Sequence, residues 1–264
     1  MDKIALIADI HGNLTALQTV LADIKKRGIK HIYCLGDIAI KGTNPNEVTD
    51  LIRENCEVTV RGNCDHLLIH NCVVPLQKWT IERLSNQNKD FLGTLPFSYD
   101  FYLSGHLIRI FHASPRSLKH IFNPLHSNAE NDYRNFEITN PKDMFENTKF
   151  LGKTENDPIP DIIGYAHIHS PNLFRYKNKL IFNTGSVGLP IEIDNSDLDR
   201  DLSHFSTMSS YVILEGNLNS KELSSYSMQL IRLPYDANKE IEKIKNSDIP
   251  DKEILLRNYL YAQS

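Results

Sequence analysis

Short apolar runs alternate with amphipathic helical spacing over the first 65 residues of this sequence. Residues 3–8 form an apolar run, and leucine, valine and isoleucine then recur at helical spacing over residues 14–24. Further apolar runs follow at residues 29–35 and 57–60, with a second short helical segment between them. A strand, a helix and a second strand in this order form a parallel pair with a right-handed crossover. The chain is therefore predicted to be an α/β protein.

The rest of the sequence predicts further strands and helices. Residues 98–103 and 107–112 read as a hairpin around a Ser-Gly pair. Residues 114–158 are polar and rich in asparagine and proline, which indicates an insertion with one short helix near 141–150. Other strands are expected at 161–165, on both sides of 177–178, at 208–214 and at 225–233, and helices at 76–95, 237–245 and 250–261.

The chain length of 264 residues exceeds the roughly 100–200 of a typical domain. We expect a main domain over residues 1–233, including the insertion at 114–158, and a C-terminal helical extension over residues 234–264. The acidic run at 194–201 is expected to be a solvated loop.

Charge and cysteine content narrow the functional classes. The net charge of −4 argues against a general nucleic-acid-binding surface. No stretch approaches the roughly 20 apolar residues of a membrane span, and the N-terminus lacks the features of a signal peptide. The four cysteines contain no C-x-x-C pair and are expected to be reduced thiols. We therefore expect a cytoplasmic protein without a membrane partner, and leave homo-oligomerisation open.

Residue types that bind metals follow several of the expected strands. Ligands of α/β sheets bind in the crevice outside the carboxyl ends of the strands. Alternate residues of an extended segment face the same side, so D-x-H and H-x-H segments should each aim two side chains into that crevice. The candidate ligands, in chain order, are Asp9, His11, Asp37, Asn63, His112, His167 and His169.

Three oxygen donors and four imidazoles are too many for one ordinary site and suit two ions that share a bridging carboxylate. The mixed set favours Mn²⁺ or Fe, with Zn²⁺, Co²⁺ or Ni²⁺ as alternatives, over a cysteine-rich structural zinc. Two ions about 3.5–4 Å apart bind a hydroxide between them and clamp phosphoryl oxygens. Taken singly, each residue has a structural alternative, such as a helix N-cap or a hydrogen-bonded core histidine. The complete ordered set favours the metal site.

The order of these motifs resembles the calcineurin-like metallophosphoesterase superfamily over about residues 1–215. The segment NTGSVGLP at 183–190 is similar to the NPGS-type segment of that superfamily's bacterial and archaeal single-domain phosphodiesterase branch. The length and the C-terminal part are similar to those of streptococcal-type asymmetric diadenosine tetraphosphate hydrolases. The matching motifs are DIHGN at 9–13, GD at 36–37, GNCD at 62–65, His112 and YAHIH at 165–169.

The resemblance implies a two-layer β-sandwich flanked by helices. It also implies two groups of metal ligands joined by the Asp37 carboxylate as a bridge. One ion would be held by Asp9, His11 and His169, and the other by Asn63, His112 and His167.

One departure from the family pattern concerns the leaving group. Many relatives have a histidine that can protonate it where this chain has Cys64, and a thiol is a poor substitute. Asp65, His66 or a water molecule are the candidate acids, unless a good leaving group needs none.

Three further residues are candidate substrate contacts. Gly12 and Asn13 stand at the start of the first helix, where free N–H groups can bind a phosphate. A helix N-cap role alone would also explain Asn13. Arg61 has a guanidinium that suits a phosphate oxygen, with a surface salt bridge as the alternative.

Together these features predict a hydrolase of a phosphodiester or phosphoanhydride bond in which a metal-bridging hydroxide attacks phosphorus. The substrate is expected to be a small phosphodiester or nucleotide, such as a dinucleoside polyphosphate. Residues 114–158 and 234–264 are expected to form or support a lid. The alternatives are a catalytically inactive binding scaffold of the same fold and a protein phosphatase.

Overall fold

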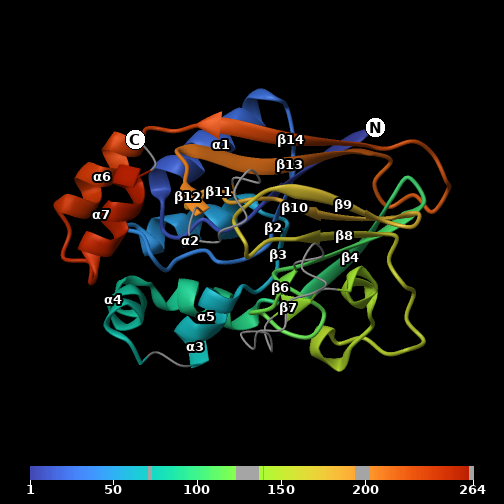
Figure 1. Cartoon of the computed structure of the whole chain (residues 1–264), viewed down its shortest axis with the longest axis horizontal. Helices are drawn as coiled ribbons and strands as arrows, with labels where there is room; N and C mark the ends of the chain where they lie inside the picture. The colour runs from blue at the N-terminus through green and yellow to red at the C-terminus, as the bar shows by residue number, and fades with distance from the viewer. Residues whose placement is uncertain (71–72, 123–136, 139, 194–202, 262–264) are drawn as a thin grey trace.

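Two five-stranded sheets pack face to face in the computed structural model, which describes residues 1–70, 73–122, 137–138, 140–193 and 203–261 (Figure 1). In the first sheet, β1, β2 and β3 are parallel, and β13 and β14 extend it as antiparallel strands. Its order is β14 (Ser227–Pro234), β13 (Met208–Gly216), β1 (Asp2–Ile7), β2 (His31–Cys34) and β3 (Val58–Thr59).

The second sheet is also built on three parallel strands. Strands β5, β8 and β10 are parallel, and an antiparallel strand closes each edge. Its order is β4 (Ser98–Leu103), β5 (His106–Phe111), β8 (Ile162–Tyr165), β10 (Lys179–Asn183) and β9 (Asn172–Tyr176). The predicted two-layer β-sandwich flanked by helices is thus confirmed, and both of its sheets are mixed.

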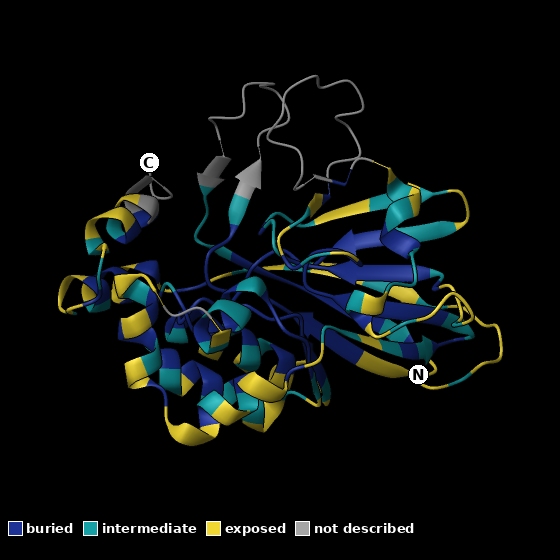
Figure 2. Ribbon diagram, turned by 90° about the horizontal axis from the view of Figure 1, so that it is seen from below, coloured by how far each residue is buried: buried dark blue, intermediate teal, exposed yellow. Residues whose placement is uncertain are grey.

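Alternation along β1 explains why the strands lie between two apolar layers. Ile4 and Leu6 pack into the core between the sheets, whereas Ala5 and Ile7 pack against the helical layer. Because both faces are covered, the strand reads as an unbroken apolar run. Figure 2 shows the strands largely buried and the exposed residues mainly on the outer faces of the helices and on loops.

The helices gather at one end of the sandwich (Figure 1). Asn13 caps α1, because its side chain accepts a hydrogen bond from the Ala16 N–H at 2.9 Å. Ser85 caps α5 and divides the helical stretch expected over 76–95 into two helices. The bounds are α1 (Leu14–Lys26), α2 (Pro45–Asn55), α3 (Asn63–His70), α4 (Pro75–Arg83), α5 (Asn86–Thr94), α6 (Ala237–Lys245) and α7 (Lys252–Tyr261).

Two local expectations need correction. The GNCD motif continues directly into α3, a helix that the sequence pattern did not indicate. The single short helix expected in the insertion is two 3₁₀ helices, η2 (Pro141–Phe145) and η3 (Lys149–Leu151), because Glu146 and Thr148 take extended backbone between them. The expected acidic loop at 194–201 lies outside the described residues. Short strand pairs complete the fold: β6 (Ile121–Phe122) with β7 (Glu137–Ile138), and β11 (Ile191–Ile193) with β12 (Ser203–Phe205).

The C-terminal helices pack on the helical layer of the main core. Ile241 and Ile244 of α6 and Tyr259 of α7 share one apolar cluster with the residues of α1. The buried Glu240 carboxylate accepts hydrogen bonds from Thr15 at 2.9 Å and Thr43 at 3.2 Å, which ties α6 to α1 and to the loop before α2. Among the described residues, the helices are all too short or too polar to cross a membrane.

Candidate metal centre

The predicted ligands come together where parallel strands of both sheets end. Asp9 and His11 follow β1, and Asp37 follows β2 in the same sheet. His112 follows β5, and the H-x-H segment follows β8 in the other sheet. The centre therefore lies at one end of the sandwich and receives side chains from both layers.

The backbone of the ligand segments is left-handed and not extended as the sequence pattern suggested. The φ angles are +52° at Asp9, +50° at His11, +56° at Asp37, +71° at His167 and +60° at His169. This conformation costs on the order of 1 kcal/mol for each non-glycine residue, and such strain concentrates at functional sites. Tight turns, and not strand alternation, therefore aim these side chains at one point.

Two glycines make the turns compatible with close packing. Gly12 has a φ of +67°, and a Cβ at this position would lie 2.7 Å from the Ala39 carbonyl oxygen. A Cβ at Gly62 would collide with the Asp37 carboxylate. The loops after β1, β2 and β3 can therefore approach one another only with glycine at these positions.

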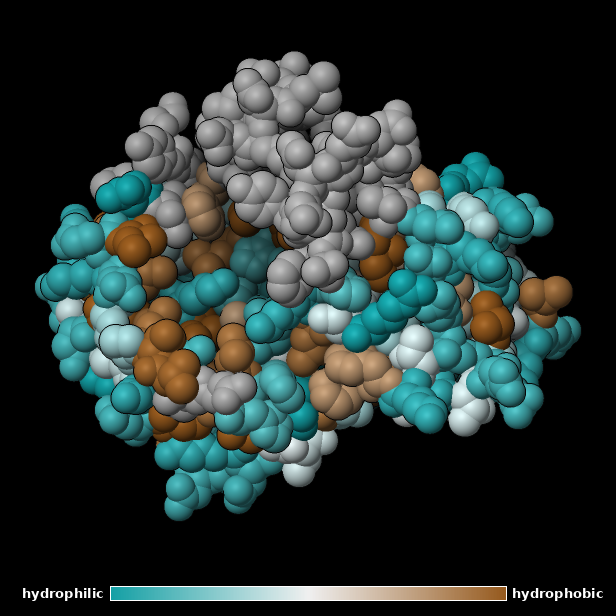
Figure 3. Space-filling view, turned by 60° about the horizontal axis from the view of Figure 1, so that its bottom comes forward, coloured by the Kyte–Doolittle hydropathy of each residue, from teal (hydrophilic) through white to brown (hydrophobic). Residues whose placement is uncertain are grey.

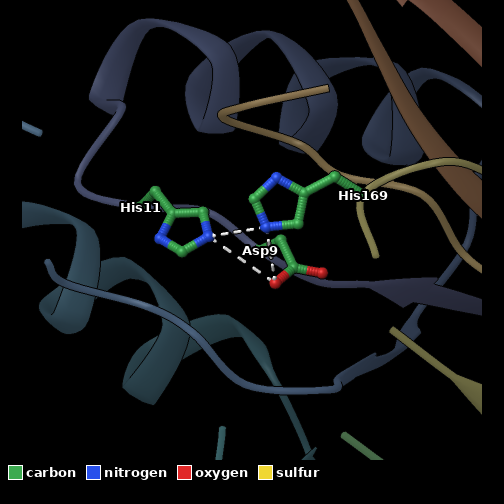
Figure 4. Close-up of side chains that lie close together, drawn as sticks. All are labelled: Asp9, His11 and His169. Carbon is green, nitrogen blue, oxygen red and sulfur yellow. Dashed lines mark hydrogen bonds and ion pairs between the residues drawn. The ribbon is translucent and has the colours of Figure 1, made fainter. Parts of the chain in front are cut away.

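Asp9, His11 and His169 form one group of ligand atoms (Figure 4). The Asp9 Oδ1 atom lies 3.6 Å from His11 Nε2 and 3.3 Å from His169 Nε2, and the two nitrogens are 3.0 Å apart. All three side chains are buried.

A second group surrounds the Asp37 carboxylate. Its Oδ1 lies 3.5 Å from His112 Nε2, and its Oδ2 lies 3.8 Å from His11 Nε2. His112 Nε2 is also 2.9 Å from Asn63 Oδ1. The His167 ring lies beside that of His112, with centroids 5.2 Å apart. Each oxygen of Asp37 thus lies near a different imidazole.

Backbone carbonyls orient three of the imidazoles. His11 Nδ1 donates to Ile40 O at 3.2 Å, His112 Nδ1 to Leu35 O at 2.7 Å and His169 Nδ1 to Leu189 O at 2.6 Å. A neutral ring that donates through Nδ1 has a free lone pair on Nε2. This is how outer hydrogen bonds fix the tautomer of metal-binding histidines.

The arrangement fits a bound cation. Two acceptor nitrogens 3.0 Å apart, on His11 and His169, repel each other unless a proton or a cation lies between them. The buried Asp9 Oδ1 beside them has no hydrogen-bond partner among the described residues. Buried polar atoms without partners are rare and point to an ion or ligand. The donor set of carboxylate and imidazole suits a divalent transition metal.

Electrostatics favour the metal-binding protonation states of Asp9, His11 and His167. Burial alone would raise the pKa of the Asp9 carboxyl, but His169 and His11 lower it well below its usual value. Burial lowers the pKa of His11 to about 4, with a further contribution from Lys41. Burial likewise lowers the pKa of His167 to about 4. Charged carboxylates and neutral imidazoles are the forms that bind metals.

The two candidate acids occupy different surroundings. Asp65 is buried, and its oxygens accept hydrogen bonds from three backbone N–H groups, so they face the chain and not a substrate. Burial and then Asp37 raise the pKa of Asp65 to about 6. His66 is half-buried on α3, one turn after Asn63, and burial lowers its pKa.

The three candidate substrate-binding residues already form hydrogen bonds within the protein. The Gly12 N–H donates to Ile38 O at 2.8 Å, and Asn13 Nδ2 donates to Gly188 O at 3.0 Å. Arg61 is buried and donates through Nη2 to Gly93 O at 2.7 Å, so a surface salt bridge does not describe it. Its guanidinium lies over the Phe97 ring at 5.1 Å.

Sequence reasoning missed Lys41 and the position of Cys64. The Cys64 thiol lies within 4.8 Å of ligand atoms of His11 and Asp37. Burial raises the pKa of Cys64 well above its usual value. Lys41 lies in the loop after β2 with a φ of +80°, and no hydrogen bond of its ammonium falls within the described residues. Hydrophobic periodicity does not reveal that a lysine with left-handed backbone lies beside His11.

Comparison with known proteins identifies the family of the chain. Residues 2–196 match the model of the calcineurin-like phosphoesterase superfamily domain. An uncharacterized protein of Methanocaldococcus jannaschii is 31% identical over 260 residues, which is 94% of each chain. The chain belongs to the calcineurin-like phosphoesterase superfamily. This is a superfamily of metal-dependent phosphoester hydrolases, and the chain is accordingly a phosphoester hydrolase.

Two solved structures share the fold over nearly the whole chain. A metallophosphoesterase from Sphaerobacter thermophilus superposes with a TM-score of 0.68 at 20% identity and covers 99% of both chains. A hypothetical protein from Pyrococcus horikoshii gives a TM-score of 0.66 at 18% identity, again over 99% of both chains. The two C-terminal helices therefore belong to a fold that these structures share.

Proposed function

We propose that this phosphoesterase hydrolyses a phosphodiester or phosphoanhydride bond with two divalent cations, with Mn²⁺ or Fe as the first candidates. Asp9, His11 and His169 would hold one ion, and Asn63, His112 and His167 the other, with Asp37 between them. When bound, the cations supply Lewis acidity that activates a water molecule and neutralises charge on the phosphoryl oxygens. A dinucleoside polyphosphate is the candidate natural substrate.

The observation that carries the proposal is the contact between His11 and His169. Their Nε2 atoms face each other at 3.0 Å while both Nδ1 atoms donate to backbone carbonyls. This pair has no stable hydrogen bond of its own when both rings are neutral, so a cation is its natural partner. The orientation of Asp37, with one oxygen toward His11 and the other toward His112, supports the bridging role.

The chain itself contributes the orientation of these ligands. Asp65 and Gly62 fix the loop of Asp37, and the carbonyls of Ile40 and Leu189 hold two of the imidazoles. Preorganised groups of this kind cost no reorganisation when charge develops in the transition state.

Hydrolysis of bis-p-nitrophenyl phosphate and of p-nitrophenyl phosphate, with Mn²⁺ and then with EDTA, tests the proposal. We expect Mn²⁺-dependent cleavage of the diester and its loss in Asp37→Asn. Dinucleoside polyphosphates are the next substrates to test. An inactive scaffold predicts no turnover despite bound metal, and a protein phosphatase predicts turnover of a phosphopeptide.

A further inference from the structure

Four partly exposed rings lie in a row beside the candidate metal centre. His66 and His70 of α3 have ring centroids 4.4 Å apart, and the Phe97 centroid is 6.3 Å from that of His66. Phe150 of η3 continues the row, 4.6 Å from Phe97. We call these four residues the ring cluster. His66, Phe97 and Phe150 are half-buried and His70 is exposed, so all four residues remain partly accessible.

The ring cluster is linked to the metal centre through α3. His66 follows Asn63 by three residues, so the two side chains lie on one face of the helix. Asn63 Oδ1 in turn lies 2.9 Å from His112 Nε2. A ligand anchored at Asn63 would therefore have the rings within reach of its other end.

A buried guanidinium borders the same rings. Arg61 lies over Phe97 at 5.1 Å, and its backbone N–H donates to Pro96 O at 2.7 Å. Its Nε is buried and has no hydrogen-bond partner among the described residues, and the same is true of His66 Nδ1. None of the carboxylates among the described residues forms an ion pair with Arg61. Two unpartnered polar atoms in one small cluster are unusual for a surface that serves only the fold.

The insertion supplies the outer ring. Phe150 is carried by η3, whose Leu151 carbonyl accepts a hydrogen bond from Ser98 at 3.3 Å. Thr148, the residue before η3, donates to the carbonyl of Pro115. These bonds hold Phe150 beside Phe97 at the start of β4. Figure 3 shows the face toward α3, α4 and α5, where hydrophobic side chains gather among hydrophilic ones.

The chemistry of the cluster indicates its ligand. Aromatic side chains stack on planar groups such as bases, and a guanidinium binds phosphate oxygens. A sugar phosphate or an inorganic polyphosphate would gain nothing from the rings. His66 and His70 at i, i+4 could also suggest a metal pair, but among the described residues no carboxylate or third ligand joins them.

We propose that the ring cluster is the base-binding subsite for a nucleoside phosphate whose phosphate group lies toward Arg61 and Asn63. This inference rests on the proposed function, because it assigns the substrate class of that same centre. It also gives the insertion a role, since Phe150 forms one wall of the subsite.

Calorimetric titration of the Mn²⁺-loaded chain of residues 1–264 tests the subsite without requiring turnover. The ligands are adenosine 5′-monophosphate and ribose 5-phosphate, which share the sugar and the phosphate and differ in the base. We expect the nucleotide to bind roughly 5- to 150-fold tighter, the range of base–aromatic stacking. Phe97→Leu and Phe150→Leu keep an apolar side chain but remove the ring, and should reduce the affinity for the nucleotide alone. Tyr102→Leu, on β4 beside Lys221, is the matched control for loss of a surface ring.

The outcomes separate this inference from the proposed function. Equal affinity for the two ligands, no measurable binding of the nucleotide, or a preference unchanged in both phenylalanine variants would overturn the subsite. An equal loss for both ligands in the variants would also overturn it, because that marks a structural defect. A base preference without hydrolysis of either bis-p-nitrophenyl phosphate or a dinucleoside polyphosphate would leave the subsite standing and reject the hydrolytic proposal. Hydrolysis without a base preference would support the hydrolytic proposal and reject the subsite.

Discussion

The Asp65 carboxylate holds the backbone of Asp37. Its Oδ2 accepts hydrogen bonds from the N–H groups of Asp37 at 2.8 Å and Gly62 at 2.9 Å, and its Oδ1 accepts from Ile38 at 2.9 Å. Asp37 has left-handed backbone with a φ of +56°, which needs outside support. Asp65 is thus a positioning residue for the carboxylate that faces both groups of imidazoles.

Replacement of Asp65 by asparagine should loosen this support. One acceptor oxygen becomes an NH₂ group, so at least one buried backbone N–H loses its partner, at about 1–3 kcal/mol. We expect the free energy of unfolding to fall by that amount and the Mn²⁺ affinity to fall with it. Urea unfolding and Mn²⁺ titration measure the two effects. The exposed Asp90→Asn on α5 is the control, and an Asp65→Asn protein with unchanged metal affinity would contradict the positioning role.

The elements that set the position of the centre could be predicted from the sequence. The apolar run of β1 follows from burial of the strand on both faces. The helical spacing of apolar residues in α1 follows from burial of the helix on one face. Local capping signals also held, as at Asn13 and at Pro45, which begins α2. These features depend on residues that are close together along the chain, so they can be recognised in the sequence.

The geometry of the centre could not be predicted in the same way. Hydrophobic pattern gives no sign of left-handed backbone at His11 or His167, because tertiary contacts impose it. The carbonyl that orients His11 belongs to Ile40, 29 residues away. Lys41 reaches the centre through that same loop. Contacts between loops of different strands therefore decide which charged residues surround the ligands.

Lys41 should contribute to the binding of the phosphate group. Burial lowers its pKa, but the Cys64 thiol, Asp37 and Asp9 raise it above its ordinary value, so the ammonium stays charged. Among the described residues it has no hydrogen-bond partner, which leaves it free for a phosphoryl oxygen. Lys41→Met should lower kcat/KM for bis-p-nitrophenyl phosphate roughly 10- to 100-fold, as expected for loss of a charge-assisted hydrogen bond.

Metal binding separates this role from a structural one. Because Lys41→Met removes a positive charge near the metal centre, its Mn²⁺ affinity should be unchanged or slightly higher. Lys41→Arg keeps the charge and should retain part of the kcat/KM that Lys41→Met loses. Lys30→Met, at an exposed lysine before β2, is the control for loss of a positive charge. A Lys41→Met enzyme with unchanged kcat/KM would show that the ammonium does not touch the substrate.

Acidification should protonate the imidazoles in a fixed order. Burial lowers the pKa of His112, but Asp37 and Asp9 more than offset this and raise it above 6.5. His11 and His167 have pKa values lowered to about 4. As the pH of the metal-free protein falls, His112 should therefore gain its proton first, and the other two should stay neutral until about pH 4.

NMR titration of the imidazole carbons measures this order, with His112→Asn for assignment. Because protons and metal compete for the same nitrogen, Mn²⁺ affinity should begin to fall as the pH drops through the pKa of His112. Protonation of His11 or His167 near pH 6.5 would contradict the electrostatic account.

Tyr259 should stabilise the region that carries Asp9 without taking part in the reaction. Its hydroxyl accepts a hydrogen bond from Asn13 Nδ2 at 3.1 Å and donates to Gly188 O at 3.4 Å. Gly188 in turn donates its N–H to the Asp9 carbonyl at 3.0 Å. Tyr259→Phe keeps the ring of α7 in the apolar cluster and removes only the hydroxyl, so the free energy of unfolding should fall by about 0.5–1.5 kcal/mol.

The effect of Tyr259→Phe on the reaction should be small, because Asn13 Nδ2 keeps its bond to the Gly188 carbonyl and still caps α1. We expect kcat for bis-p-nitrophenyl phosphate to change less than threefold while the urea midpoint falls. Tyr102→Phe, at a hydroxyl outside this network, should leave both unchanged. A large loss of kcat at full Mn²⁺ saturation would instead assign the C-terminal helix a direct part in positioning the metal ligands.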